Sequence, residues 1–249
     1  MLEGKHALVT GGGTGIGLAI ARALADQGAQ VTITGRRYEV LKEVATEGLF
    51  PMAMDVTDEA QQINGIAQAV AERGPIQICV ANAGIAEGRT LQKTDLDFWR
   101  KIMATNLDGA FVTMRESMKS MLTTDWGRVI AISSIAGVKG LKGAGAYSAS
   151  KHGIIGLIRT YAEEHMGGPI TFNAICPGYV DTPIVARNAD SIQARAGLSK
   201  EAAQDIMVQA NCHKRLITPE EIAASAVWLC HPNSASVNAQ TIEIAGGQV

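Results

Sequence analysis

The chain has 249 residues, 47% of them hydrophobic and 4% aromatic, and its 22 basic and 24 acidic side chains give a formal net charge of −2. Because no block of one charge sign occurs, the composition excludes the basic surface that binds nucleic acid or anionic membranes. No stretch approaches the ~18 uninterrupted apolar residues of a membrane span, and the first residues lack a signal-peptide pattern, so we expect a cytoplasmic protein.

Short β-branched segments alternate with longer helical patterns along the chain. In chain order the strand-like segments are HALVT (6–10), QVTIT (30–34), PMAMD (51–55), IQICVA (76–81), RVIAIS (128–133), ITFNAI (170–175) and QTIEIA (240–245). This alternation predicts an α/β fold, a doubly wound (Rossmann) and mostly parallel seven-stranded sheet with helices on both faces. The length fits a single domain over residues 1–249.

Two helices carry clear end signals. In IGLAIARALADQG (16–28) the apolar positions share one face, and Gly28 is placed to end the helix. In TPEE (218–221), Thr218 is an expected N-cap and Glu221 completes a capping box.

One long stretch, 182–217, lacks strand character. It follows the sixth strand, where a doubly wound fold places loops over its ligand. We therefore predict a substrate lid at about 182–217 with a helix near 199–211; the alternative is an ordinary surface excursion.

The first strand runs into TGGGTGIG (10–17) and then directly into a helix. Glycines let the backbone approach a pyrophosphate, and the positive end of the helix favours that anion. The literal G-x-G-x-x-G pattern is absent, since Ile16 and Leu18 stand where a third glycine would fall, so a purely structural turn is the alternative. The residues predicted to cradle a dinucleotide are Gly11, Thr14, Gly15, Ile16 and Gly17.

The end of the second strand, TITGRR (32–37), bears on the choice of cofactor. An acid there would bind the ribose of NAD, whereas arginine accommodates the 2′-phosphate of NADP. Gly35 replaces the acid, and Arg36 and Arg37 supply planar donors suited to phosphate. We expect NADP(H), with NAD(H) as second choice; the alternative is that both arginines are merely solvated.

Tyr147 and Lys151 lie four residues apart in YSASK, so on a helix both would face one cleft. A nearby ammonium favours phenolate and would lower the pKa of the tyrosine, which makes it a general acid or base for a carbonyl or alcohol. Ser134 ends a strand 13 residues before Tyr147 and would hydrogen-bond the same substrate oxygen. Two unrelated surface residues are the alternative.

Together with ANAG (81–84), NLDG (106–109) and PGYVDTP (177–183), these motifs resemble those of the short-chain dehydrogenase/reductase family across nearly the whole chain. The resemblance implies an NADP(H)-dependent oxidoreductase that interconverts a ketone and a secondary alcohol by hydride transfer. The catalytic tetrad that it implies is Asn106, Ser134, Tyr147 and Lys151.

The resemblance gives each tetrad member a role. Tyr147 is the acid/base and Ser134 orients the carbonyl. Lys151 holds the nicotinamide ribose and lowers the pKa of the tyrosine, while Asn106 supports a water in the proton relay and also marks a helix kink.

The family pattern implies further cofactor contacts to the adenine, the cofactor cleft and the carboxamide. With both catalytic side chains included, these are Asp55, Val56, Asn82, Gly84, Tyr147, Lys151, Pro177, Gly178, Val180 and Thr182. Asp55 has an alternative role as N-cap of the following helix.

The expected substrate pocket is small to medium and mostly apolar. Its residues are Ala86, Ala136, Val138, Ala144, Tyr179 and Ile184. Family members that oxidise 3-hydroxybutyrate carry polar or basic groups at three of these positions, all alanine here, so that activity is disfavoured. Arginines that dock carrier proteins would fall at Asp125 and Gly168, which puts carrier docking in doubt.

A neutral ketone or the acyl part of a CoA thioester, such as a 3-oxoacyl thioester, suits this pocket. Lys139 and Lys142, beside its mouth, would meet an anionic tail or simply be solvated.

Other readings of the chain stay open. One is an NAD-dependent alcohol dehydrogenase of the same family, and another is a non-catalytic dinucleotide-binding sensor. Family analogy implies a homotetramer built on helices around 95–122 and 148–166. The four cysteines are too widely spaced for a metal site, so we expect reduced thiols and no metal.

Overall fold

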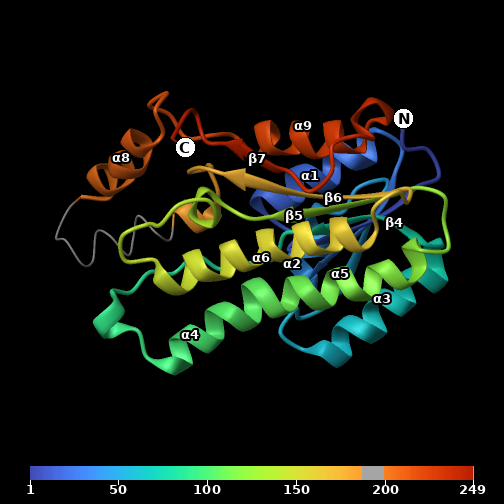
Figure 1. The fold of residues 1–249 in the computed structure, drawn as a ribbon, viewed down its shortest axis with the longest axis horizontal. Coiled ribbons are helices and arrows are strands. Elements are labelled where there is room, and N and C mark those ends of the chain that lie inside the picture. The colour runs from blue at the N-terminus through green and yellow to red at the C-terminus, as the bar shows by residue number, and fades with distance from the viewer. Residues whose placement is uncertain (187–198, 249) are drawn as a thin grey trace.

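Figure 1 shows the computed structural model of the protein, which describes residues 1–186 and 199–248. Within these residues, seven parallel strands form one sheet in the order β3-β2-β1-β4-β5-β6-β7. The strands are β1 (His6–Thr10), β2 (Gln30–Gly35), β3 (Leu49–Ala53), β4 (Ile76–Ala81), β5 (Gly127–Ile132), β6 (Ile170–Pro177) and β7 (Thr241–Ile244). The predicted doubly wound sheet is therefore confirmed.

The inner strands are apolar because helices cover both faces of the sheet. Every residue of β5 and of β6 is buried, as a parallel sheet inside an α/β fold requires. The strand β3 lies at the edge, where the missing N–H of Pro51 is tolerated.

Two layers of helices enclose the sheet, with α1 and α9 on one face and α3, α5 and α6 on the other (Figure 1). Their apolar side chains form two core clusters, one on each side of the strands. The helices are α1 (Gly15–Asp26), α2 (Tyr38–Val44), α3 (Glu59–Arg73), α4 (Leu96–Met103), α5 (Gly109–Met121), α6 (Gly145–Glu164), α8 (Lys200–Ala210) and α9 (Pro219–Cys230). Shorter turns are the 3₁₀ segments Leu91–Lys93, Ile135–Gly137 and Pro232–Ser234 and the π-helical turn Ala104–Asp108.

The predicted helix signals are found where expected. Gly28 follows α1 with φ +95 and donates its N–H to Ala25 O over 2.8 Å. Thr218 and Glu221 form a complete capping box at the start of α9. The helix predicted near 199–211 is α8, capped by Ser199. Residues 187–198 of the predicted lid lie outside the described residues.

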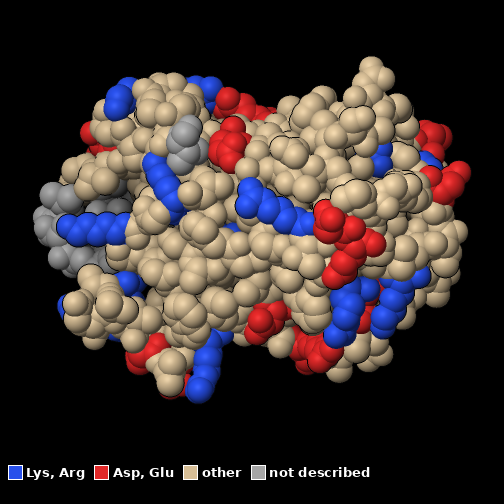
Figure 2. All heavy atoms as spheres, viewed as in Figure 1, with Lys and Arg blue, Asp and Glu red and all other residues tan. Residues whose placement is uncertain are grey.

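The strand order reverses direction between β1 and β4, and ligands of doubly wound sheets bind beside this switch point at the carboxyl ends of the strands. Acidic and basic side chains are interspersed over the face shown in Figure 2. Among the described helices, none combines the length and apolar character needed to span a bilayer. All four cysteines are free thiols, with Cys212 the exposed one.

Candidate active site

The glycine-rich turn after β1 closes tightly at the switch point. Gly11 and Gly15 have φ values of +66 and +54, a region that glycine occupies without strain. A Cβ on Gly17 would collide with Gly11 O and with Asn82 Nδ2. Only glycine therefore fits at Gly17, and the N-terminus of α1 stays open to an anion because Thr14 makes no side-chain cap bond there.

Asn82 holds this turn from the neighbouring strand. Its Nδ2 donates to Thr10 O over 2.8 Å, and its backbone N–H donates to Thr10 Oγ1 over 3.0 Å. Ala83 N donates to the same hydroxyl over 3.0 Å. The end of β4 thus fixes the glycine turn, and Thr10 is a positioning residue that the motif alone did not identify.

Thr182 closes the turn from the other side. A Cβ added to Gly15 would lie 3.1 Å from Thr182 Cγ2. The segment that leads from the end of β6 to Thr182 is held in two places. Val180 forms a β-bridge with Ile217, and Gly178 N donates to Ile244 O over 2.9 Å. The two predicted cofactor-binding loops therefore face each other.

Arg36 and Arg37 follow β2 and are exposed. The end of this strand reaches the glycine turn, because Gly12 N donates to Thr34 O over 3.1 Å. Within residues 1–186 and 199–248, no salt bridge to either guanidinium is present. Both cations are thus near the cradle and available to an anion.

Asp55 is not the N-cap of α3, so that alternative is wrong. The cap is Asp58, whose side chain accepts from Gln61 N over 3.0 Å. Asp55 Oδ1 instead accepts from the N–H and hydroxyl of Thr57, at 2.9 and 2.8 Å. This local turn orients Asp55 and Val56 beside the end of β3.

Ser134, Tyr147 and Lys151 meet at the carboxyl ends of β5 and β6. The Ser134 side chain is hydrogen-bonded with the hydroxyl of Tyr147 and also accepts from Ala136 N over 3.1 Å. Lys151 is buried, its Nζ 5.8 Å from the Tyr147 ring centroid, and it donates to Ile132 O over 2.7 Å. The three predicted side chains therefore share one site.

Burial dominates the protonation of this site. It raises the pKa of Tyr147, although the bond to Ser134 opposes the shift. Burial also lowers the pKa of Lys151 to about 8. The pKa of the tyrosine is thus raised and not lowered as predicted, because loss of hydration is the largest cause and outweighs the hydrogen bond to Ser134.

Asn106 is fully buried in the π-helical turn between α4 and α5, where the regular α-helical hydrogen-bond pattern is interrupted. Its side chain binds the backbone of Ile85 twice, accepting from N at 2.8 Å and donating to O at 2.9 Å. It also donates to Ser150 Oγ over 3.1 Å, and Ser150 donates to Tyr147 O over 2.7 Å. A Cβ on Gly84 would lie 3.2 Å from Asn106 Oδ1 and 3.6 Å from Lys151 Nζ.

Comparison with known proteins identifies the family of this site. A family model described as short chain dehydrogenase matches residues 5–193. The chain belongs to the short-chain dehydrogenase/reductase family. It is an oxidoreductase that acts on CH–OH and C=O groups, and its relatives are named as dehydrogenases and reductases.

D-beta-hydroxybutyrate dehydrogenase of Cupriavidus necator is 34% identical over 100% of this chain and 99% of its own length. A putative ketoacyl reductase of Streptomyces coelicolor is 35% identical over 98% of this chain and 97% of its own. Among solved structures, an actinorhodin polyketide ketoreductase with NADPH has a TM-score of 0.95 at 32% identity and covers 100% of this chain and 99% of that one. Each similarity covers at least 98% of this chain.

The residues predicted to line the substrate pocket differ in their burial. Ala136 is fully buried within the 3₁₀ turn Ile135–Gly137, whereas Val138, Ala144, Ala86 and Ile184 are half-buried. Tyr179 is half-buried, and its phenol adds to the upward shift of the pKa of Tyr147.

Asn211 is a positioning residue that the sequence did not reveal. It is fully buried and follows α8. Its Oδ1 accepts from Tyr179 N over 3.1 Å, and its Nδ2 donates to Tyr179 O over 2.9 Å and to Arg215 O over 2.8 Å. Asn211 thus ties the segment that carries Tyr179 to the corner after α8.

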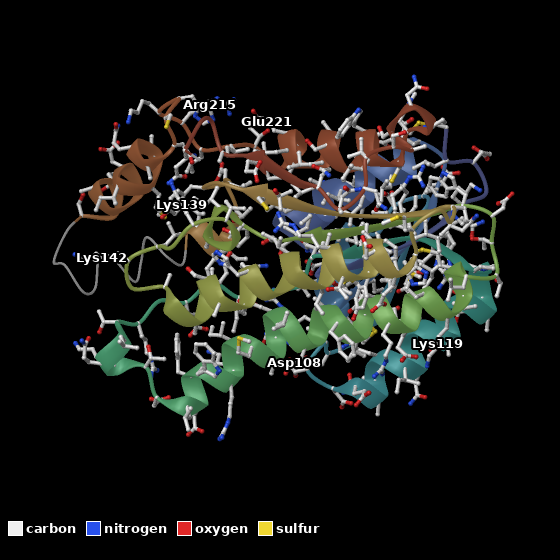
Figure 3. The ribbon with its side chains drawn as sticks, viewed as in Figure 1. Asp108, Lys119, Lys139, Lys142, Arg215 and Glu221 are labelled. Carbon is white, nitrogen blue, oxygen red and sulfur yellow. The ribbon has the colours of Figure 1, made fainter. Side chains whose placement is uncertain are left out.

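Lys139 is not a solvated lysine, as one prediction had it. Its Nζ donates to Gln248 O over 2.6 Å. Lys142, from the same loop, is exposed (Figure 3).

Proposed function

We propose that the chain is an NADP(H)-dependent reductase that interconverts a ketone and a secondary alcohol. The observation that carries this proposal is the meeting of the Ser134 and Tyr147 hydroxyls beside the buried Lys151 ammonium, next to a glycine cradle that a Cβ would fill. The bound nicotinamide would supply or accept the hydride.

The chain's own residues would move the proton. The phenol of Tyr147 keeps its proton because burial raises its pKa, so it suits donation to the oxygen of a reduced carbonyl. Ser134 would donate a hydrogen bond to the same oxygen. Lys151 would hold the ribose, and Asn106 would keep the loop at Ile85 and the start of α6 in register.

The preference for NADP(H) is supported by Arg36 and Arg37 beside the cradle and by the solved ketoreductase with NADPH. We expect kcat/KM to favour NADPH over NADH. Arg36→Ala should lower kcat/KM for NADPH about tenfold or more and leave that for NADH nearly unchanged, since a charged hydrogen bond to phosphate is lost. Arg100→Ala, an exposed arginine on α4, is the matched control. An unchanged NADPH preference in Arg36→Ala would remove Arg36 from this role.

For the substrate, we propose a neutral ketone or a 3-oxoacyl thioester. The alanines at positions 86, 136 and 144 offer no partner for a small carboxylate, while relatives include a putative ketoacyl reductase. Following NADPH absorbance over a panel of ketones, 3-oxoacyl-CoA thioesters and 3-oxobutyrate tests this choice. Preferred turnover of 3-oxobutyrate would contradict it and favour the activity named for the hydroxybutyrate dehydrogenase relatives.

One variant distinguishes the proposed reductase from a non-catalytic dinucleotide sensor. Tyr147→Phe should abolish turnover of every carbonyl while NADPH still binds. Cofactor binding with no turnover by the unaltered protein would support the sensor.

We also propose a cytoplasmic homotetramer that associates through helices around 95–122 and 148–166. The exposed Leu96 and Trp99 on α4 support an interface there. Light scattering on the purified protein tests the oligomeric state.

A further inference from the structure

The segment 245–248 forms a tight turn after β7, which we name the terminal turn. Gly246 and Gly247 have φ values of +58 and +83, and Gln248 N donates to Ala245 O over 3.2 Å. Residues with side chains adopt such φ values rarely, so the two glycines specify the turn. In Figure 1 this end of the chain lies near α8, at the carboxyl edge of the sheet.

The segment that carries Tyr179 and the corner after α8 both contact the terminal turn. Gly178, the neighbour of Tyr179, lies close to it, because a Cβ on Gly178 would be 3.2 Å from Ala245 Cα. At the corner after α8, Cys212 Sγ donates to Gly247 O over 3.2 Å. The turn therefore contacts both segments that Asn211 ties together.

Lys139 lies in the loop that begins at Ser134, residues 134–141, which we name the serine loop. Its Nζ joins this loop to the terminal turn through the bond to Gln248 O. The backbone between Lys139 and Ser134 is itself hydrogen-bonded, with Lys139 N donating to Ile135 O over 3.0 Å and Gly137 N to Ser134 O over 2.8 Å. A displacement of Lys139 would thus be passed through the 3₁₀ turn to Ser134.

We propose that Lys139 is a positioning residue, which binds the terminal turn and so holds Ser134 at a fixed distance from the substrate-side segment that carries Tyr179. The bond is charge-assisted and half-buried, so water competes with it only in part. Because the ammonium is engaged by a backbone carbonyl, it serves the architecture of the pocket and not an anionic tail of the substrate.

The kinetic test compares Lys139→Met with Lys142→Met, an exposed lysine from the same loop. With a neutral ketone, Lys139→Met should lower kcat/KM about tenfold, the equivalent of one charged hydrogen bond. Lys142→Met should stay within about twofold, as expected of an exposed side chain. NADPH affinity, measured by fluorescence, should not change in either variant, and Lys139→Arg should restore most of the activity.

A second arm needs no turnover and so stands apart from the proposed ketone activity, on which the kinetic arm rests. In Lys139→Met, amide hydrogen exchange should rise in peptides that cover 134–141 and 243–248. Gly246→Ala, whose Cβ would lie 2.6 Å from His213 Cδ2, should disturb the same link. The double variant should then lose no more activity than the worse single one, because both changes break one coupling.

Two results would overturn the proposal. One is unchanged hydrogen exchange in the serine loop of Lys139→Met. The other is a loss of activity confined to anionic substrates such as CoA thioesters, which would make Lys139 a ligand-binding residue.

Discussion

Burial drives Tyr147 and Lys151 toward their neutral forms. The pKa of the phenol is raised and that of the ammonium is lowered to about 8. At neutral pH the phenol therefore holds its proton and most of the lysine is charged, the combination that carbonyl reduction needs.

The first prediction concerns the pH dependence of ketone reduction. The lysine is charged below its pKa, so kcat/KM should fall as the pH rises through about 8, while the phenol is still protonated. Steady-state rates between pH 6 and pH 10 would reveal this fall in kcat/KM. Lys151→Arg should be slower, but its kcat/KM should fall only at a higher pH, because a guanidinium stays charged. If kcat/KM of this variant still falls near pH 8, another group causes the fall.

The second prediction concerns Gly17. Gly17→Ala should weaken NADPH binding at least tenfold, because its Cβ would collide with the backbone of the cradle and with Asn82. Gly156→Ala is the matched control: a Cβ there has nothing within 4 Å, and the helical position should gain about 0.5–1 kcal/mol of stability. Fluorescence titration with NADPH and urea unfolding measure the two effects. Equal NADPH affinity in both variants would contradict the close packing at Gly17.

At the scale of elements, α9 depends on its first turn. Glu221 bonds Thr218 N over 2.8 Å and both terminal nitrogens of Arg215, at 2.6 and 2.7 Å (Figure 3). These bonds lower the pKa of Glu221 to about 2. A depressed carboxylate pKa stabilises the folded state above the unfolded value of 4.5, and this contribution is lost as the pH falls toward 2.

The third prediction follows for this helix start. Thr218→Ala should lower the free energy of unfolding by about 1 kcal/mol. Glu221→Gln should cost about 0.5 kcal/mol at pH 7, since the ion pair is exposed to water, and should flatten the loss of stability between pH 4.5 and pH 2. Urea unfolding at pH 7 and pH 3 measures both. Glu220→Gln, an exposed neighbour in the same turn, is the control.

Elements with a local signal could be predicted from the sequence. The apolar strand runs, Gly28 and the capping box at Thr218 depend on neighbouring residues only, and all are found. The roles of Asn211 and Lys139 could not be predicted, because each depends on a partner far along the chain, 32 and 109 residues away. The predicted direction of the Tyr147 pKa shift was wrong for a similar reason: the spacing shows the neighbouring lysine but not the loss of hydration at both groups.

At the scale of the molecule, the candidate active site lies at the carboxyl ends of the strands, whereas the amino ends carry side chains that hold the fold together. His6, the first residue of β1 at the amino ends of the strands, is buried and joins three parts of the fold. Its Nδ1 lies 2.8 Å from Gly74 O and its Nε2 lies 2.9 Å from Thr32 Oγ1. Because burial lowers the pKa of this imidazole, the neutral ring is the form that the fold stabilises.

The last prediction is a loss of stability in weak acid. A depressed histidine pKa contributes stability that is present above the unfolded value of 6.5 and lost as the pH falls through the lower folded value. The free energy of unfolding in urea should therefore decline below pH 6.5, a window separate from that of Glu221. His6→Gln should be less stable at pH 7.5 but show a weaker decline, whereas the exposed His152→Gln should behave like the unaltered protein. An equally steep decline in His6→Gln would assign the acid sensitivity to another group, and the buried imidazole would then have no part in it.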